Sequence, residues 1–212
     1  IDDASGKITG LRFELQECLL GYLHILDQTI RRHGIPGAIY SDLHTIFFSP
    51  KRDKLTIEDE LAGVKLPLTQ FGRALSQLGI EHIPARSPRA KGRIERLWAT
   101  LQARLVLELR IAGISTLEAA NAFLPDFIER FNRQFAVEPA DPVSAFRSAP
   151  DNETLTTIIA WHDNRRASHG STISFDKQEY QLVTPGGDVV SLKPKAAVTV
   201  VRCLNGDLVA LY

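Results

Sequence analysis

The chain of 212 residues contains no methionine and only two cysteines, and its 25 basic and 25 acidic residues leave no net charge. Cys18 and Cys203 lie far apart and lack the short spacing of zinc ligands, so neither a disulfide framework nor a zinc site is expected. No apolar stretch approaches the length of a membrane span, and the N-terminus lacks a basic-then-apolar signal pattern. These absences favour a reducing, cytoplasmic setting without a membrane partner.

Sequence motifs of several enzyme classes are also missing. The chain has no Gly-x-Ser-x-Gly turn and no glycine-rich phosphate loop, which leaves serine-hydrolase, P-loop and dinucleotide-binding functions without support. Because the net charge is zero, any argument for nucleic-acid binding must rest on local charge. The chain begins at Ile1 and has no methionine, so we expect it to be a fragment of a longer polypeptide.

The first half of the chain alternates strand and helix patterns. Hydrophobic residues make up 44% of the chain, enough for one full domain plus a small one, or for two modest domains. A β-prone run at 8–13 follows a turn and is expected to form a hairpin with residues 1–2. The expected elements that follow are a helix from Leu19 closed by Gly34, a strand over 38–42, a charged loop or short exposed helix over 50–67, a helix over 69–78 and a strand over 80–83.

The second half is helical first and then rich in β-prone runs. A long basic helix is expected from Arg89, and another over 116–135 that is broken or kinked at Pro125. Prolines then mark a linker, which a short helix over 153–162 follows. Five β-prone runs separated by glycine-rich turns predict a small barrel, namely 172–175, 180–183, 189–192, 197–202 and 208–212. Basic residues are few there, so a structural or oligomerising role is as reasonable as DNA binding.

Glu95 lies near the start of the long basic helix. Its neighbours Ile94, Leu97, Trp98 and Leu101 recur at intervals of three and four residues and form one apolar stripe. Since one residue rotates the helix by about 100°, Glu95 sits at the border between the stripe and solvent, where its carboxylate can reach into a cleft. The alternative is that Glu95 only favours the helix start or pairs with an arginine.

Asp42 is the second candidate carboxylate. It follows the short β-prone run 38–40, so it is expected at the C-terminal end of a strand, where open α/β sheets place ligand sites. Two carboxylates that converge from a strand end and a helix suit Mg²⁺ or Mn²⁺ and metal-assisted phosphoryl transfer on DNA. The alternative for Asp42 is an ordinary turn or helix-capping residue. Nearby His44 either orients a ligand or phosphate or is a surface or packing histidine.

Local positive charge surrounds Glu95. The interval 86–110 holds only two acidic residues, Glu95 and Glu108, and its basic residues are Arg86, Arg89, Lys91, Arg93, Arg96, Arg104 and Arg110. Such a run can bind DNA phosphates, and its alternative is a solvated helix face. The residues expected to contact phosphates are Arg89, Lys91, Arg93 and Arg96.

Taken together, five segments resemble the DDE transposases of bacterial insertion sequences and the retroviral-type integrases, most closely the insertion-sequence group called ISNCY. Residues 1–13 are similar to the second and third strands of that family. Residues 40–47 resemble the segment with its second catalytic aspartate, and 91–96 followed by 100–102 resemble the segment with its catalytic glutamate. Residues 131–135 fit the motif of its following helix, and the C-terminal run is similar to its SH3-like barrel.

The resemblance implies an α/β fold with three parts: an RNase H-like integrase core over 1–135 without its first strand, a helical linker over 136–166 and a small SH3-like β-barrel over 167–212. It implies a polynucleotidyl transferase that cuts a DNA 3′ end with water and joins the freed hydroxyl to target DNA. Asp42 and Glu95 would be its catalytic and metal-binding residues, in a two-metal site for Mg²⁺ or Mn²⁺. Its partners would be transposon ends and target DNA, bound by a homo-oligomer in a nucleoid-associated, cytoplasmic setting in bacteria.

The chain departs from the family in two respects. The family's first aspartate would lie upstream of Ile1, so we expect this fragment to be catalytically incomplete, with Asp2 and Asp3 as poor substitutes at a strand end. The interval from Asp42 to Glu95 is longer than in retroviral integrases, which an insertion around 50–67 would explain. Two alternatives remain: an RNase H-like nuclease that only hydrolyses, and a non-catalytic DNA-binding or assembly protein with a decayed integrase fold.

Overall fold

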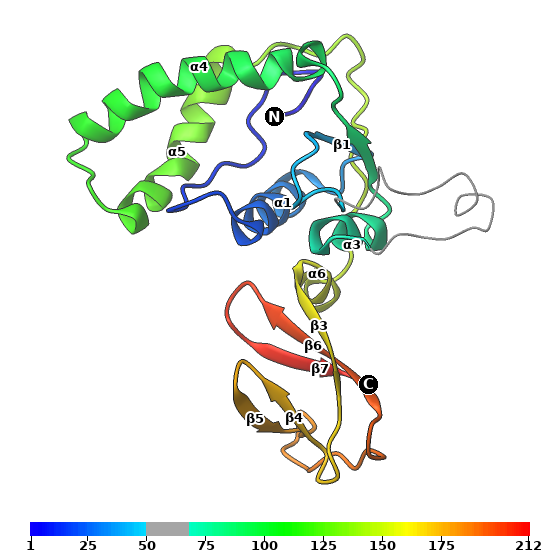
Figure 1. Ribbon diagram of the computed structural model, residues 1–212. Helices are drawn as coiled ribbons and strands as arrows, with labels where there is room; N and C mark the ends of the chain where they lie inside the picture. The colour runs from blue at the N-terminus through cyan, green and yellow to red at the C-terminus, as the bar shows by residue number, and fades with distance from the viewer. Residues whose placement is uncertain (50–67) are drawn as a thin grey trace. The chain divides into compact units, whose positions relative to one another are not determined.

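The computed structural model describes residues 1–49 and 68–212, which divide into two compact units, Ile1–Pro150 and Asp151–Tyr212. The chain is mixed α/β, as the sequence predicts (Figure 1). The insertion expected around 50–67 lies outside the described residues. Within the described ranges, every helix is too short or too polar to span a lipid bilayer.

Among the described residues of the first unit, two parallel strands form a sheet. β1 (Ala38–Ser41) pairs with β2 (Glu81–Pro84), which confirms both predicted strands. The backbone ladder continues past their ends, because the Ala85 N–H donates to the Ser41 carbonyl at 2.8 Å. The C-terminal ends of both strands therefore lie at one edge of the sheet.

Two predicted helices pack near this sheet. α1 (Leu19–His33) buries Leu23, Leu26 and Ile30 and ends at Gly34, which has a φ of 97°. α3 (Gln70–Gln77) is capped by Thr69, whose side chain accepts a hydrogen bond from the Gly72 N–H and so satisfies a free donor of the first turn.

The two long helices of the first unit lie against each other (Figure 1). α4 (Pro88–Ile111) and α5 (Leu117–Phe135) were both predicted, and α5 continues through Pro125 without a break. Their shared core is apolar and also takes in the N-terminal segment. Its buried members are Ile8, Leu11, Leu101, Leu105, Leu124, Phe127, Ile128 and Phe131.

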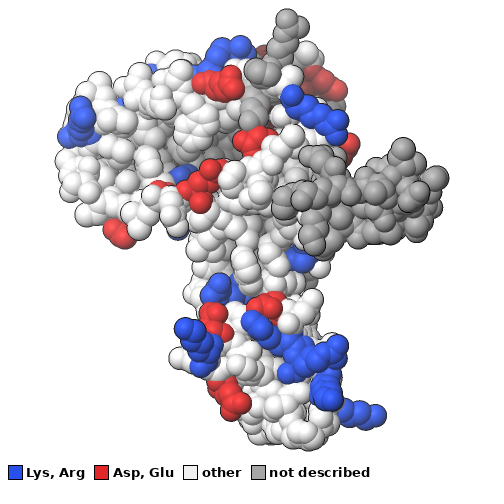
Figure 2. All heavy atoms as spheres, in the orientation of Figure 1, with Lys and Arg blue, Asp and Glu red and all other residues white. Residues whose placement is uncertain are grey.

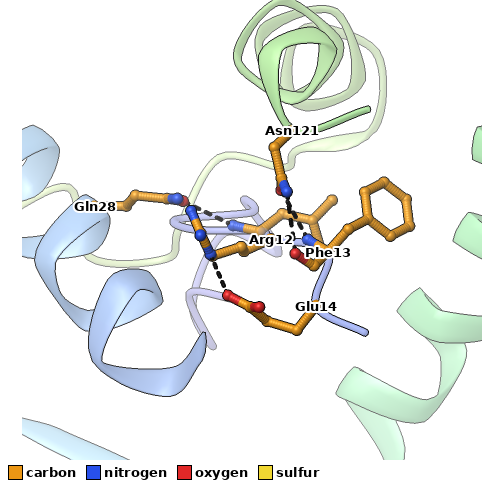
Figure 3. A network of polar contacts seen from close by, with 6 residues as sticks. Arg12, Phe13, Glu14, Gln28 and Asn121 are labelled. Atoms are coloured by element: carbon orange, nitrogen blue, oxygen red, sulfur yellow. Dashed lines mark hydrogen bonds and ion pairs between the residues drawn. The ribbon is translucent and has the colours of Figure 1, made fainter. Parts of the chain in front are cut away.

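The predicted strand over 8–13 is wrong, because this segment forms no ladder with any described strand. Residues 2–7 make a turn that the Asp2 N–H closes on the Lys7 carbonyl at 2.8 Å. Side chains then bind the backbone that follows. Gln28 of α1 accepts from the Leu11 N–H at 3.2 Å, and Asn121 of α5 both accepts from Phe13 N–H and donates to its carbonyl, at 2.9 and 3.0 Å (Figure 3). The predicted hairpin is thus replaced by an extended segment held by helices.

The second unit opens with the short helix α6 (Asn152–Ile158) and is otherwise β structure. Its strands are β3 (Ala160–Arg166), β4 (Thr172–Phe175), β5 (Gln178–Gln181), β6 (Ala197–Cys203) and β7 (Leu208–Leu211). They form a three-stranded sheet in the order β3-β6-β7 and a two-stranded sheet of β4 and β5. The described strands therefore form two sheets and no closed barrel.

Two details of this unit differ from the sequence prediction. The helix expected over 153–162 ends at Ile158, and residues 160–166, assigned to a helical linker, form strand β3 paired with β6. The run over 189–192 contributes only an isolated bridge between Val183 and Val189. The core between the two sheets includes Ile173, Phe175, Val198 and Val200.

Candidate functional site

Asp42 directly follows β1, at the edge where both parallel strands end. It is half-buried, and its Oδ1 accepts a hydrogen bond from the His44 N–H at 3.1 Å. His44 is exposed, and its Nδ1 accepts from the Ile46 N–H at 3.3 Å. Both side chains therefore shape the turn after the strand, which is the turn function that the sequence left open for Asp42.

Aromatic rings pack beside Asp42. The Tyr22 ring lies edge-on to Phe47, with centroids 4.6 Å apart, and Phe47 lies edge-on to Phe71 at 5.2 Å. Burial raises the pKa of Tyr22 strongly, helped by its hydrogen bond to Glu17 and by the charges of Glu17 and Asp42. The phenol therefore stays neutral, and the Asp42 carboxylate lies close enough to Tyr22 for its negative charge to oppose ionisation of the phenol.

Ser41 and His82 form a polar contact at the same strand ends. The Ser41 Oγ lies 2.7 Å from the His82 Nε2, and the Ser41 hydroxyl also donates to the Asp42 carbonyl at 3.2 Å. Sequence analysis missed this pair, because the contact depends on the register of two strands about 40 residues apart. The sequence signal for it was a histidine next to Glu81 within the short β-prone run at 80–83.

Glu95 lies on α4, the helix that follows β2. β2 ends at Pro84 and α4 begins at Pro88, so Glu95 is about two turns into the helix. Its side chain is exposed and makes no hydrogen bond or ion pair with any described residue, so the arginine pair given as an alternative for Glu95 is not formed with a described arginine.

Asp42 and Glu95 thus belong to segments that leave one sheet edge from neighbouring strands. Carboxylate oxygens are the ligands that Mg²⁺ and Mn²⁺ prefer, so the chemistry of the two residues fits such an ion. Among the described residues, no group of three or more His, Cys, Asp or Glu side chains is arranged to hold a metal. Joint binding of a metal by Asp42 and Glu95 stays a prediction.

The basic residues of α4 lie around Glu95. Arg93 and Arg96 are exposed, and Arg93 Nη1 lies 3.3 Å from the Asp3 Oδ1. Arg89 and Lys91 lie at the start of the helix, and their side chains are outside the described set. The Arg93 contact brings the N-terminal turn next to the start of α4.

Asp2 and Asp3, the weak alternative ligands, both have partners here. Asp2 accepts hydrogen bonds from the Ser5 N–H, at 2.9 Å, and from the Ser5 hydroxyl. Burial alone would raise the pKa of Asp2, but these bonds and nearby positive charge hold it below its ordinary value. The Asp2 carboxylate therefore stabilises the N-terminal turn in which Asp2 itself lies.

The second unit also carries exposed positive charge. In the view of Figure 2, the larger group of basic side chains lies on the right of this unit, and others lie on its left beside acidic ones. Arg202 Nη1 pairs with Asp176 at 3.0 Å, and the guanidinium groups of Arg165 and Arg202 lie 5.8 and 5.7 Å from the Phe175 ring centroid. The guanidinium groups of Arg165 and Arg202 thus cover part of the β core.

Comparison with known proteins gives two similar relatives. The chain is 42% identical over 185 residues to a putative transposase, y4bF, of Sinorhizobium fredii, an alignment that covers 86% of this chain and 38% of the relative. It is 38% identical over 208 residues to the transposase for insertion sequence IS1202 of Streptococcus pneumoniae, covering 98% of this chain and 43% of the relative. The chain spans about two fifths of the length of these curated relatives. No protein-family model matches the chain.

Proposed function

We propose that the chain is part of a DDE-type DNA transposase and carries two of its catalytic carboxylates, Asp42 and Glu95. The observation that carries the proposal is topological. Asp42 ends β1, and Glu95 lies on the helix that follows the parallel neighbour β2. Similarity to two proteins named as transposases, over 86% and 98% of the chain, supports the same function.

The proposed fold is an RNase H-like core followed by an SH3-like β module. The parallel pair of β1 and β2, with α1, α3 and α4 connected to it, supports the first part. The two small antiparallel sheets of residues 160–211 support the second.

In the proposed reaction, water attacks a phosphorus at the transposon end and frees a 3′ hydroxyl, which then attacks a phosphodiester of target DNA. Asp42 and Glu95 would hold Mg²⁺ or Mn²⁺, which would supply activation of the nucleophile and stabilisation of the leaving oxygen. The exposed Arg93 and Arg96, together with Arg89 and Lys91, would bind DNA phosphates and hold the substrate in place. A homo-oligomer on DNA is proposed as the acting form.

The test is a cleavage and joining assay with the full-length protein that carries this chain and the DNA ends of its own element. Asp42→Asn and Glu95→Gln are expected to abolish cleavage and joining in Mg²⁺ while DNA binding stays near wild type. Asp126→Asn and Glu129→Gln are matched controls, because both residues are exposed on α5, and they are expected to act like wild type. Wild-type turnover by Asp42→Asn or Glu95→Gln would overturn the proposal.

The same assay separates the two alternative functions. A protein that cleaves the ends but yields no joined product is a nuclease that only hydrolyses. A protein that binds the ends without cleaving them in Mg²⁺ or Mn²⁺ is a DNA-binding or assembly protein with a decayed site.

A further inference from the structure

We propose that His82 is a positioning residue that fixes Asp42 by way of Ser41, an inference that rests on the proposed role of Asp42 as a metal ligand. In the parallel register, His82 lies opposite Ile39. Side chains two residues apart on a strand share a face, so Ser41 lies on the same face as Ile39. The ring of His82 therefore reaches along the sheet to the Ser41 hydroxyl, at 2.7 Å.

The donors and acceptors of this contact follow from the chemistry of its three groups. A carbonyl oxygen can only accept, so the Ser41 hydroxyl gives its single proton to the Asp42 carbonyl, at 3.2 Å. In the proposal the Ser41 oxygen then accepts from His82, and the proton of the imidazole is assigned to Nε2 on this basis. The result is a directed chain from the His82 Nε2–H through the Ser41 hydroxyl to the main chain of Asp42.

Aromatic packing fixes the donor of this chain. The His82 ring stacks on Phe48, with centroids 4.2 Å apart and planes 16° apart. It also lies edge-on to Phe47 and Phe71, with centroids 6.2 and 5.9 Å away. A ring held by three aromatic neighbours cannot easily rotate away from Ser41, so it gives the hydroxyl a fixed donor.

Asp42 is consequently held both by its main chain and by its carboxylate. Its main-chain carbonyl accepts from Ser41, and its carboxylate accepts from the His44 N–H at 3.1 Å. Hydrogen bonds of this supporting kind orient the side chains that bind metals, and misplacement by about 1 Å of a reacting group lowers rates strongly. Loss of the Ser41 to His82 contact should therefore loosen the turn that carries Asp42 while the sheet itself persists.

Two substitutions of His82 separate positioning from packing. His82→Phe keeps an aromatic ring among the phenylalanines but removes the donor, whereas His82→Gln keeps an amide donor near the position of Nε2 but removes the ring. Ser41→Ala removes the hydroxyl, and Ser41→Thr keeps it. The positioning role predicts that His82→Phe and Ser41→Ala are impaired, and that His82→Gln and Ser41→Thr retain most of the wild-type behaviour.

Two readouts on the full-length protein test this role. In DNA cleavage, His82→Phe and Ser41→Ala should lower kcat about 10- to 100-fold and raise the Mg²⁺ concentration for half-maximal rate, with KM for DNA unchanged. The double variant should be no worse than either single one, because the residues act as a unit. Without metal or DNA, hydrogen exchange of the His44 amide should be faster in both variants than in wild type.

Each contrary outcome overturns the inference. Wild-type exchange and wild-type kcat in Ser41→Ala would show that the contact does not fix Asp42. A functional His82→Phe together with an impaired His82→Gln would assign His82 to aromatic packing alone. Failure of the proposed function would give a different result, namely wild-type DNA cleavage by Asp42→Asn. The exchange rate of the His44 amide reports on the turn regardless of activity.

Discussion

Asn132 binds both backbone polar groups of Ile8, from which it is separated by 124 positions in the sequence. Its Oδ1 accepts from the Ile8 N–H at 2.8 Å, and its Nδ2 donates to the Ile8 carbonyl at 2.9 Å. Asn121, three turns earlier on the same helix face, binds Phe13 in the same way. The two asparagines thus attach the extended segment 8–13 to α5, where a strand partner was predicted.

Asn132→Asp is expected to destabilise the first unit by about 1–3 kcal/mol, because it removes the donor to the Ile8 carbonyl and places a carboxylate against it. Urea denaturation of wild type and variant measures the difference. Gln134→Glu makes the same amide-to-acid change on the exposed side of α5 and should leave stability within about 0.5 kcal/mol of wild type. Equal effects of the two changes would refute the structural role of Asn132.

Gly34→Ala is expected to destabilise the protein by more than about 1 kcal/mol. Gly34 has a φ of 97°, and an added Cβ would lie 2.4 Å from the Arg147 carbonyl oxygen. That oxygen accepts from the Ile35 N–H at 2.8 Å, within a backbone pair that attaches the segment before Pro150 to α1. Gly37→Ala is the control, since a Cβ there meets open space. Thermal denaturation measures both variants, and equal melting temperatures would contradict the expectation.

Glu108 links the two long helices and should give the first unit a pH-dependent stability. Its hydrogen bond to Arg130, at 2.8 Å, and a second to Arg104, at 3.1 Å, hold the pKa of Glu108 below its ordinary value. A carboxyl whose pKa is lowered on folding contributes stability that is complete above its unfolded pKa, about 4.3, and that is lost as pH falls through the folded pKa.

The melting temperature of Glu108→Gln should therefore lie below that of wild type at pH 7, and the difference should shrink as the pH falls below about 4. Glu129→Gln, at an exposed position of α5, should follow the wild-type curve throughout. A difference that grows toward acid would show that Glu108 stabilises the helix pair by something other than its charge.

Local patterns in the sequence predicted much of this structure. The apolar intervals around Leu97 and Leu101 predicted α4. Thr69 marked the start of α3, and Gly34 marked the end of α1. The short run before Asp42 predicted β1 and thereby the place of Asp42 at a strand end. These features depend on residues within one or two turns of each other.

Features that depend on distant partners were missed. The segment 8–13 has a β-prone composition, but its backbone is bound by Asn121 and Asn132, which lie more than 100 positions away. Strand β3 was assigned to a helix and linker because its pairing with β6 is a tertiary feature that overrides local preference. The Ser41 to His82 contact likewise follows from strand register, which the sequence alone does not define.

Replacing Arg89, Lys91 and Arg93 with alanine tests the proposed phosphate contacts. Each lost contact should lower the slope of log affinity against log salt by about 0.9, with little dependence on DNA sequence. The matched control replaces one exposed lysine and two exposed arginines elsewhere in the first unit, Lys7, Arg32 and Arg133. Fluorescence anisotropy over a salt series measures both slopes, and an unchanged slope in the first variant would show that the cluster is only a solvated helix face.

Asp42 and Glu95 are proposed to bind the same divalent cation, and the position of bound Mn²⁺ shows whether they do. Anomalous diffraction from crystals of the full-length protein grown with Mn²⁺ would locate the ion. We expect a peak with carboxylate oxygens of both residues within coordination distance, about 2.1 Å for a cation of this class. A structure with the Asp42 and Glu95 carboxylates on opposite faces of the first unit, or with Mn²⁺ bound to neither, would contradict it.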